Sequence, residues 1–289
     1  MRRIVFITGY ATISKEGQRF IFRNFEGKRG VPVRYVDMIL VSGKVSITGD
    51  AVNLMLTEKI PLFFLTRFYR LRGALIGDLQ GRRSSIRAKQ FEAFRSRRVE
   101  IARDIVRRKV EAVKRAFSIE LKEEKAQLEK AKSLTEVMGV EGSVSRKMFS
   151  RFRENIEGCG LTFRERTYNP PRDEVNALLS LSYTLSYCLA LPVVLFVGLD
   201  PYISFLHTGR GSHLSLCSDI IEPVRPVVTK LLQDPIIREV FRPEDFSRNG
   251  SGFYLKKEAV SKFLNWFEGV KDEITREIRD SVLFLEERL

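Results

Sequence analysis

The hydrophobic pattern of this chain changes its period once, close to residues 81–85. Before that point, short apolar runs such as RFIFRNF alternate with polar residues or are rich in β-branched residues, and glycines separate them, which is typical of strands joined by turns. From Ile86 onward, apolar residues recur at spacings of three and four, which is typical of one face of a helix. We therefore expect an α+β fold, with a β-rich domain over residues 1–82 and a larger all-α domain over residues 83–289.

Local signals add detail to both predicted domains. In the first, Asp50 can cap a single helix over AVNLMLTEK, and the remaining runs predict a sandwich or coiled sheet. In the second, the apolar spacing predicts one long helix over residues 84–117, followed by helices that are separated by turns such as YNPPRD and RNGSG. Asp173 is a candidate cap for the helix that follows YNPPRD.

The charge of the chain is strongly basic and unevenly distributed. The formal net charge is +14, and residues 81–115 alone carry thirteen basic against four acidic side chains. A charge run is often only a solvated helix face, but the concentration of the surplus on one helix favours a surface that contacts phosphates. Nucleic acid is the first partner to expect, and an acidic membrane surface is the second. The candidate DNA-binding arginines are Arg95, Arg98, Arg103, Arg164, Arg166 and Arg172.

Cysteine usage and hydropathy indicate the compartment. The three cysteines are widely spaced and form no C-x-x-C pair, which favours a reducing cytosol over secretion. The longest apolar run, residues 188–199, contains Pro192 and is too short to span a membrane. The apolar run at the N-terminus is too short for a signal peptide. We expect a soluble cytoplasmic protein whose partner is nucleic acid rather than a membrane.

Both histidines of the chain fall within FLHTGRGSHLSLCSDIIEP, residues 205–223, shortly before two carboxylates. A helix that begins near Ser212 would place Ser215, Asp219 and Glu222 on one face, and Pro223 would end or kink it near Glu222. The turn after His207 can fold its imidazole back toward that face. Histidine and carboxylate together are ligands for a divalent metal ion.

Two interpretations of this segment stay open from the residues alone. Neighbouring carboxylates repel each other unless a cation lies beside them, and the cation can be a metal ion or a protein side chain such as Arg210 or Arg225. Glu141, in the segment GVEG, is ambiguous in the same way. It is either a functional carboxylate or a favourable negative charge near the start of a helix.

Four segments, in this order along the chain, resemble the CRISPR-associated integrase family, the universal metal-dependent protein of spacer acquisition. They are GVEG with Arg146 and Phe149 after it, then RDEVNALLSLSYTL, then GLDPYISFLHTGRGSHLSLCSDIIEPVRPVV, and the helical end with YLKKEAVSKFLNWFE. The resemblance is diffuse over residues 1–80 and strong from 139 to about 228. It also includes the layout of a β-rich domain followed by a helical one.

The resemblance implies a site and assigns residues to it. Glu141, His207 and Glu222 match the family's ligands for Mg²⁺ or Mn²⁺. Catalytic roles are implied for these three and for Asp219 and Arg225. Asn176 and Tyr183 match polar positions near the site and are expected to contact DNA. Ser204 is a departure, because the family commonly has glycine there. His213 falls outside the match and is expected to be a turn or DNA-facing residue, and Cys217 is expected in the core.

The resemblance also implies an activity and partners. The expected enzyme is a DNA integrase and endonuclease that inserts short DNA duplexes into a CRISPR repeat array by attack of a 3′-hydroxyl on a phosphodiester. Its expected partners are double-stranded and branched DNA, a second copy in a homodimer formed through the β-rich domain, and a small ferredoxin-like adaptation protein. A non-catalytic nucleic-acid-binding scaffold, in which the carboxylates only pair with arginines, is the alternative.

Overall fold

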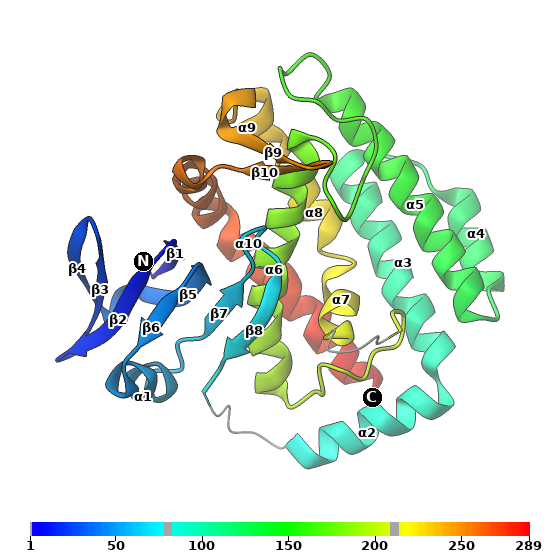
Figure 1. Ribbon diagram of the computed structural model, residues 1–289. Helices are drawn as coiled ribbons and strands as arrows, with labels where there is room; N and C mark the ends of the chain where they lie inside the picture. Colours follow the sequence, from blue (N-terminus) through cyan, green and yellow to red (C-terminus); the bar gives the residue numbers. More distant parts are fainter. Residues whose placement is uncertain (1, 78–82, 209–213) are drawn as a thin grey trace. The chain divides into compact units, whose positions relative to one another are not determined.

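The computed structural model describes residues 2–77, 83–208 and 214–289. The chain divides into two compact units, Met1–Gln80 and Gly81–Leu289 (Figure 1). Strands dominate the first unit and helices the second. The predicted combination of a β-rich N-terminal part and a larger helical C-terminal part is thereby confirmed.

The described part of the first unit contains two four-stranded sheets and one α-helix. Its elements are β1 (Arg3–Thr8), β2 (Ala11–Glu16), β3 (Arg19–Asn24), β4 (Gly27–Pro32), η1 (Val33–Tyr35), β5 (Val36–Ser42), β6 (Val45–Ile47), α1 (Gly49–Thr57), β7 (Leu62–Leu65) and β8 (Leu71–Leu75). One sheet has the order β1-β5-β7-β8, in which only β8 runs antiparallel to its neighbour. The other has the order β4-β3-β2-β6, in which β6 pairs parallel with β2.

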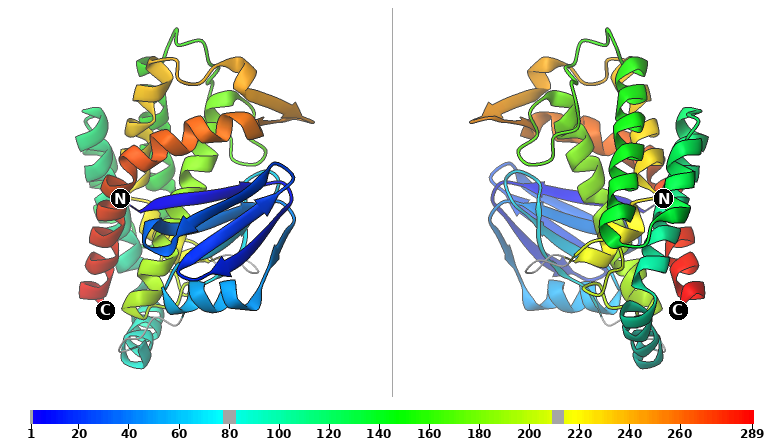
Figure 2. Two further views of the ribbon diagram at one scale, coloured as in Figure 1. Left: turned by 90° about the vertical axis from the view of Figure 1, so that its left-hand side faces the viewer. Right: turned by 90° about the vertical axis from the view of Figure 1, so that its right-hand side faces the viewer.

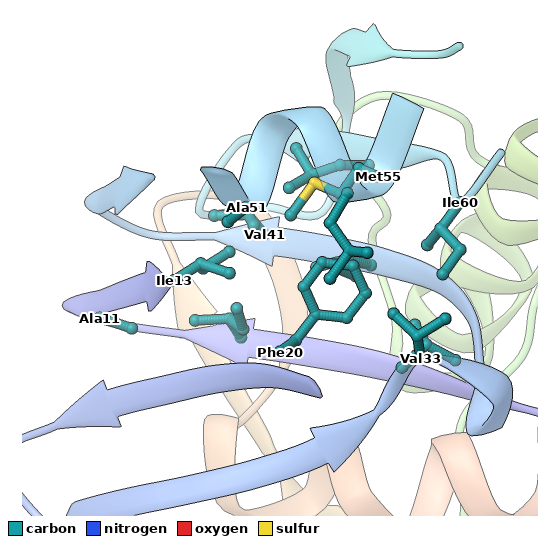
Figure 3. Close-up of a cluster of buried hydrophobic side chains, with 13 residues drawn as sticks. Ala11, Ile13, Phe20, Val33, Val41, Ala51, Met55 and Ile60 are labelled. Carbon is teal, nitrogen blue, oxygen red and sulfur yellow. The ribbon is translucent and has the colours of Figure 1, made fainter. Parts of the chain in front are cut away.

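The two sheets and α1 share one hydrophobic core (Figure 3). Phe20 and Ile13 come from one sheet, Ile39 and Leu62 from the other and Met55 from α1, and all five side chains are fully buried. Burial of a side chain of this size contributes about 1.5–3 kcal/mol. This shared core explains why the alternating runs of the first 80 residues fold together rather than as separate hairpins.

The start of α1 differs from the prediction. Thr48, not Asp50, is the capping residue, and its hydroxyl accepts a hydrogen bond from the Ala51 N–H at 3.4 Å. Asp50 lies in the first turn of the helix, where its negative charge interacts favourably with the helix dipole.

The second unit is built around one long apolar helix. Its elements are α2 (Arg83–Ser96), α3 (Arg98–Phe117), α4 (Lys122–Lys130), α5 (Leu134–Asn155), α6 (Glu174–Val197), α7 (Ser215–Ile221), α8 (Arg225–Leu231), α9 (Gln233–Ile237), η2 (Pro243–Asp245), β9 (Phe246–Asn249), β10 (Gly252–Leu255), η3 (Lys257–Ala259) and α10 (Val260–Arg288). The central helix α6 packs against α7, α8, α10 and β10 (Figure 1, Figure 2). As predicted, Asp173 caps α6, and its carboxylate accepts from the Asn176 N–H at 2.7 Å.

Helix α6 is long and apolar enough to cross a membrane by length and composition. However, 67% of its most apolar 18-residue window is buried inside the protein, as in the core helix of a soluble protein. Its hydrophobicity is therefore explained by packing against the surrounding helices.

Two predicted features of the helical part need correction. The expected helix over 84–117 is interrupted at Arg97, which separates α2 from α3. The Ser96 hydroxyl donates to the Glu92 carbonyl at 2.8 Å, a type of bond that competes with the helix backbone and often bends it. In addition, the segment around RNGSG joins the antiparallel strands β9 and β10 rather than two helices, and Gly250 adopts a positive φ of 59° in the turn.

The shared core of the first unit leads to a stability prediction. Phe20→Ala removes a fully buried ring and leaves a cavity, so we expect a loss of about 3–5 kcal/mol in the free energy of unfolding of this unit. Phe25→Ala is the control, because Phe25 is 92% exposed, and its effect should stay within about 0.5 kcal/mol. Urea unfolding followed by circular dichroism measures both values. Equal losses for the two variants would contradict the assignment of the core.

Candidate metal centre

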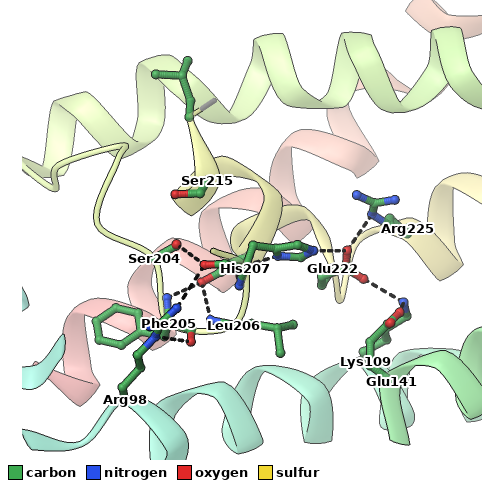
Figure 4. A network of polar contacts seen from close by, with 12 residues as sticks. Arg98, Lys109, Glu141, Ser204, Phe205, Leu206, His207, Ser215, Glu222 and Arg225 are labelled. Carbon is green, nitrogen blue, oxygen red and sulfur yellow. Dashed lines mark hydrogen bonds and ion pairs between the residues drawn. The ribbon is translucent and has the colours of Figure 1, made fainter. Parts of the chain in front are cut away.

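Charged side chains from separate segments of the second unit meet around Lys109 (Figure 4). Lys109 lies on α3, Glu141 on α5, and Glu222 directly follows α7. The Lys109 ammonium bonds to Glu141 Oε1, to Glu222 Oε2 at 2.7 Å and to the Ser145 hydroxyl at 2.8 Å. The Lys109 side chain is almost fully buried, so these three acceptors replace the water that it would bind in solution.

Helix packing brings these residues together. Helix α3 packs along α5 and α8, which places Lys109 between the segments that carry the two glutamates. Glu141 lies in the middle of α5, not at the start of a helix as expected. The helix begins at Leu134, where the Ser133 hydroxyl accepts from the Glu136 N–H, and it continues through both glycines of GVEG. The interpretation of Glu141 as a charge near a helix start is therefore wrong.

Asp219 holds the turn that carries His207. Its carboxylate accepts hydrogen bonds from the backbone N–H groups of Phe205 at 2.6 Å, Leu206 at 3.0 Å and His207 at 2.9 Å. A further contact of 2.8 Å joins Asp219 Oδ1 to His207 Nδ1. Because the carboxylate accepts, it favours a proton on Nδ1 and leaves Nε2 available as a ligand. Nε2 lies 3.6 Å from Glu222 Oε1.

The turn has a second group of supports that sequence reasoning did not identify. Arg98, predicted to bind DNA, donates to the carbonyl groups of Phe205 at 3.0 Å and His207 at 3.3 Å. The hydroxyl of Ser204, where the resembled family commonly has glycine, donates to the same His207 carbonyl. The Gln90 side chain, fully buried, donates to the Ile203 carbonyl at 2.7 Å. These contacts fix the backbone that presents His207.

Glu222 has a strongly lowered pKa. Burial by itself would raise its pKa, but the positive charges of Arg225 and Lys109, with a smaller effect of His207, lower the pKa to about 2. Arg225 Nε lies 3.0 Å from Glu222 Oε1. The pKa of Lys109 is raised, because the attraction of the two glutamates outweighs the effect of burial. Lys109 and Glu222 are therefore both charged at neutral pH.

The pKa of His207 is also raised. Burial would lower it, but the hydrogen bond to Asp219 and the charges of Asp219 and Glu222 outweigh that effect. The imidazole therefore lies in a strongly negative local field. Such a field attracts a cation, whether that cation is a proton or a metal ion.

The donor set fits a divalent metal ion. Glu141, His207 and Glu222 offer two carboxylates and one imidazole nitrogen, which suit Mg²⁺ or Mn²⁺. In the described ranges, no three histidine, cysteine or carboxylate side chains already form a cluster at metal-binding distance. Instead, the Lys109 ammonium bridges the two glutamates.

The remaining predicted residues occupy different positions. Arg95, Arg164 and Arg172 are exposed, and Arg103 is partly buried. Asn176 and Tyr183 are buried and bonded inside the protein: Asn176 accepts from Arg166 at 2.8 Å, and the Tyr183 hydroxyl contacts the Thr229 hydroxyl at 2.6 Å. They support the site from within. Cys217 is buried in the core, as expected, whereas Arg210, Ser212 and His213 lie outside the described residues.

Two arginines flank the Tyr183 ring beside this site. The guanidinium carbon of Arg225 lies 5.0 Å from the ring centroid, and that of Arg166 lies 5.5 Å from it. Arg166 bonds to Asn176 and to the Ser180 hydroxyl, both neutral acceptors. Its pKa is lowered, chiefly by burial. Two guanidinium groups therefore lie against the same ring, and that of Arg225 is also paired with Glu222.

Comparison with known proteins identifies the family. The family model described as CRISPR associated protein Cas1 matches residues 5–269. The chain belongs to the Cas1 family. A CRISPR-associated endonuclease Cas1 from Methanothermobacter thermautotrophicus is 26% identical, over 91% of this chain and 81% of the relative. One from Leptospira interrogans is 31% identical, over 66% of this chain and 83% of the relative.

Solved structures share the fold of this Cas1-family chain. A CAS1 protein from Thermotoga maritima matches with a TM-score of 0.90 and 24% identity, over 99% of this chain and 96% of that one. A casposase bound to an integration product matches with a TM-score of 0.85 and 20% identity, over 99% and 91%. A Cas6-RT-Cas1–Cas2 complex matches with a TM-score of 0.76 and 20% identity, over 99% of this chain and 34% of that one.

The contacts of Asp219 predict a structural as well as a chemical effect of its replacement. Asp219→Asn puts an NH₂ group where a carboxylate oxygen now accepts backbone hydrogens, so we expect a loss of about 1–3 kcal/mol in the free energy of unfolding. Asp234→Asn is the control, because Asp234 pairs with Arg238 on the surface. Chemical denaturation measures both. A loss no larger than that of the control would contradict the role of Asp219 in holding the turn.

Proposed function

We propose that this Cas1-family chain is a divalent-metal-dependent DNA integrase and endonuclease that inserts short DNA duplexes into a CRISPR repeat array. The observation that carries the proposal is that Glu141 and Glu222, from two segments far apart in the sequence, share the Lys109 ammonium, while His207 Nε2 lies 3.6 Å from Glu222 Oε1. The curated relatives are named endonucleases, and the matching casposase structure is described as bound to an integration product. Both support nucleic-acid phosphodiester chemistry.

In this proposal, Glu141, His207 and Glu222 would hold Mg²⁺ or Mn²⁺. When bound, such an ion would polarise a phosphoryl oxygen and make an attacking hydroxyl more acidic. Asp219 keeps His207 Nε2 turned toward Glu222. Arg225, beside Glu222, is placed to offset negative charge that develops on the phosphate.

The reaction conserves phosphodiester bonds. The 3′-hydroxyl oxygen of the incoming strand forms a bond to phosphorus while the existing bond to the oxygen of the target strand breaks, and the released strand end takes up a proton. No nucleotide cofactor is needed, because one phosphodiester replaces another. With water as the nucleophile, the same site would nick or cleave DNA, including branched DNA.

DNA and protein partners belong to the same proposal. Exposed basic residues of α2 and the loop before α6, such as Arg95, Arg164 and Arg172, would contact phosphates of double-stranded or branched DNA. We also propose a homodimer formed through the β-rich unit and a small ferredoxin-like adaptation partner. The match to the Cas1 portion of a complex that contains Cas2 supports a protein partner of this kind.

The alternative of a non-catalytic nucleic-acid-binding scaffold is favoured by one observation. Glu222 pairs with Arg225 and Lys109, and Glu141 pairs with Lys109, so protein cations can balance both carboxylates. In that case the site would only tie helices together. Metal-dependent chemistry distinguishes the two functions.

Strand joining tests the proposed catalytic site. In Mn²⁺ at fixed salt, Glu141→Gln and His207→Ala should lower the rate of joining of a DNA end to a repeat-containing duplex by at least about a hundredfold, because each removes a ligand. DNA affinity, measured by fluorescence anisotropy, should change little. The control is Glu154→Gln on the same helix, since Glu154 pairs with Arg151 on the surface. Undiminished joining by both site variants would refute the assignment.

Salt dependence tests the proposed DNA surface. Replacement of Arg95 and Arg103 by Gln should flatten the plot of log affinity against log salt by about one unit for each phosphate that the protein no longer neutralises. Arg115→Gln is the matched control on α3, because Arg115 already pairs with Glu277. Affinity measured between 50 and 300 mM salt, roughly the useful range for such interactions, gives the slopes. An unchanged slope for the double variant would mark these arginines as a solvated helix face.

A further inference from the structure

Lys109 is the one residue in the described part of the site that binds both Glu141 and Glu222. Its ammonium has three hydrogens, and the structure gives each an acceptor: the two glutamates and the Ser145 hydroxyl. Ser145 in turn donates to the same oxygen of Glu141, at 2.8 Å. This is a complete coordination shell for a monovalent protein cation, built from two of the three proposed metal ligands.

We propose that Lys109 is an internal counter-cation that competes with the divalent ion for Glu141 and Glu222, so that metal binding requires its ammonium to leave at least one of them. This inference rests on the metal centre proposed above and extends it to a residue outside the proposed ligand set. It makes Lys109 a determinant of metal affinity.

The oxygen atoms available at the site support competition rather than coexistence. Glu222 Oε2 contacts Lys109, while Glu222 Oε1 contacts Arg225 and faces His207 Nε2. An ion that binds His207 and Glu222 through Oε1 would have the ammonium on the other oxygen of the same carboxylate. Like charges that share one carboxylate in a buried site repel strongly. An ion that also binds Glu141 would share that carboxylate with the ammonium as well.

The burial of Lys109 shows why the competition matters. A metal ion would easily displace a buried ammonium that had only weak partners. The Lys109 ammonium instead binds two carboxylates, and its two ion pairs hold those carboxylates close together. Its removal therefore has two opposite consequences. Without metal, the variant lacks the cation that balances the negative charges of Glu141 and Glu222. With metal, a divalent ion can bind both carboxylates without competition from an ammonium.

The test compares Mn²⁺ binding and unfolding of the full-length wild-type chain with those of Lys109→Met and Lys109→Gln. Free Mn²⁺ is followed by electron paramagnetic resonance during titration, and the unfolding midpoint is measured with and without Mn²⁺. We expect both neutral variants to bind Mn²⁺ more tightly by about tenfold or more, since one competing charge is removed. They should unfold at lower temperature without Mn²⁺ and gain more from it than the wild type does.

Control variants separate charge from other effects. Lys109→Arg keeps the cation and should bind Mn²⁺ no more tightly than the wild type. Lys114→Met removes an exposed charge from the same helix and should leave Mn²⁺ affinity unchanged. If a neutral Lys109 variant folds only when Mn²⁺ is present, that dependence also supports the proposal. A variant that fails to fold under both conditions would overturn it.

Two further results would refute competition, and they differ from a failure of the metal centre itself. Neutral Lys109 variants that bind Mn²⁺ as the wild type does, or more weakly, would make Lys109 a helper or a structural residue. If instead the wild type binds no Mn²⁺, or His207→Ala binds it equally well, the metal centre is wrong. The inference then falls with it.

Discussion

The second unit depends on the balance of buried charge around Glu222. A carboxylate removed from water costs several kcal/mol unless positive groups and hydrogen bonds replace its solvent. Here Lys109 on α3 and Arg225 at the start of α8 supply that positive charge. Because these residues and Glu141 belong to different helices, the helices can pack closely only if the charges meet. The geometry of the site therefore depends on the packing of the helices, and the packing depends on the pairing of these charges.

Asp219 is also a buried carboxylate, but it chiefly binds the backbone of a turn. The turn before His207 is irregular, so three of its consecutive N–H groups lack partners within regular secondary structure. One buried carboxylate accepts all three and also orients the imidazole. Had Asp219 been a metal ligand, its oxygens could not have served the turn. Of the three acids singled out in the sequence, Asp219 therefore binds the backbone of the turn, whereas Glu141 and Glu222 bind the Lys109 ammonium.

The sequence could predict what is local and periodic. The change of period located the β-rich and helical parts, and the spacing of Asp219 and Glu222 with Pro223 after them predicted a helix that ends near Glu222. The positions of individual site residues in three dimensions could not be predicted from local patterns. Glu141 looked like a helix start because glycines surround it, yet tertiary packing carries α5 through them. Lys109 gave no signal, because it is one of many basic residues on its helix and its partners are distant in sequence.

The contacts of the basic residues on α3 show that net charge overestimates the positive charge available to DNA. Arg107, Arg108 and Lys109 are consecutive, but Arg107 pairs with Asp104 and Glu129, Arg108 lies over the Phe284 ring, and Lys109 enters the site. Charges that are already paired or buried within the protein release fewer counterions when DNA binds. The basic surplus of this segment is therefore an upper bound on the number of phosphates it can neutralise. The electrostatic surface available to DNA is set by which faces the helices bury, and that follows from the fold rather than from composition.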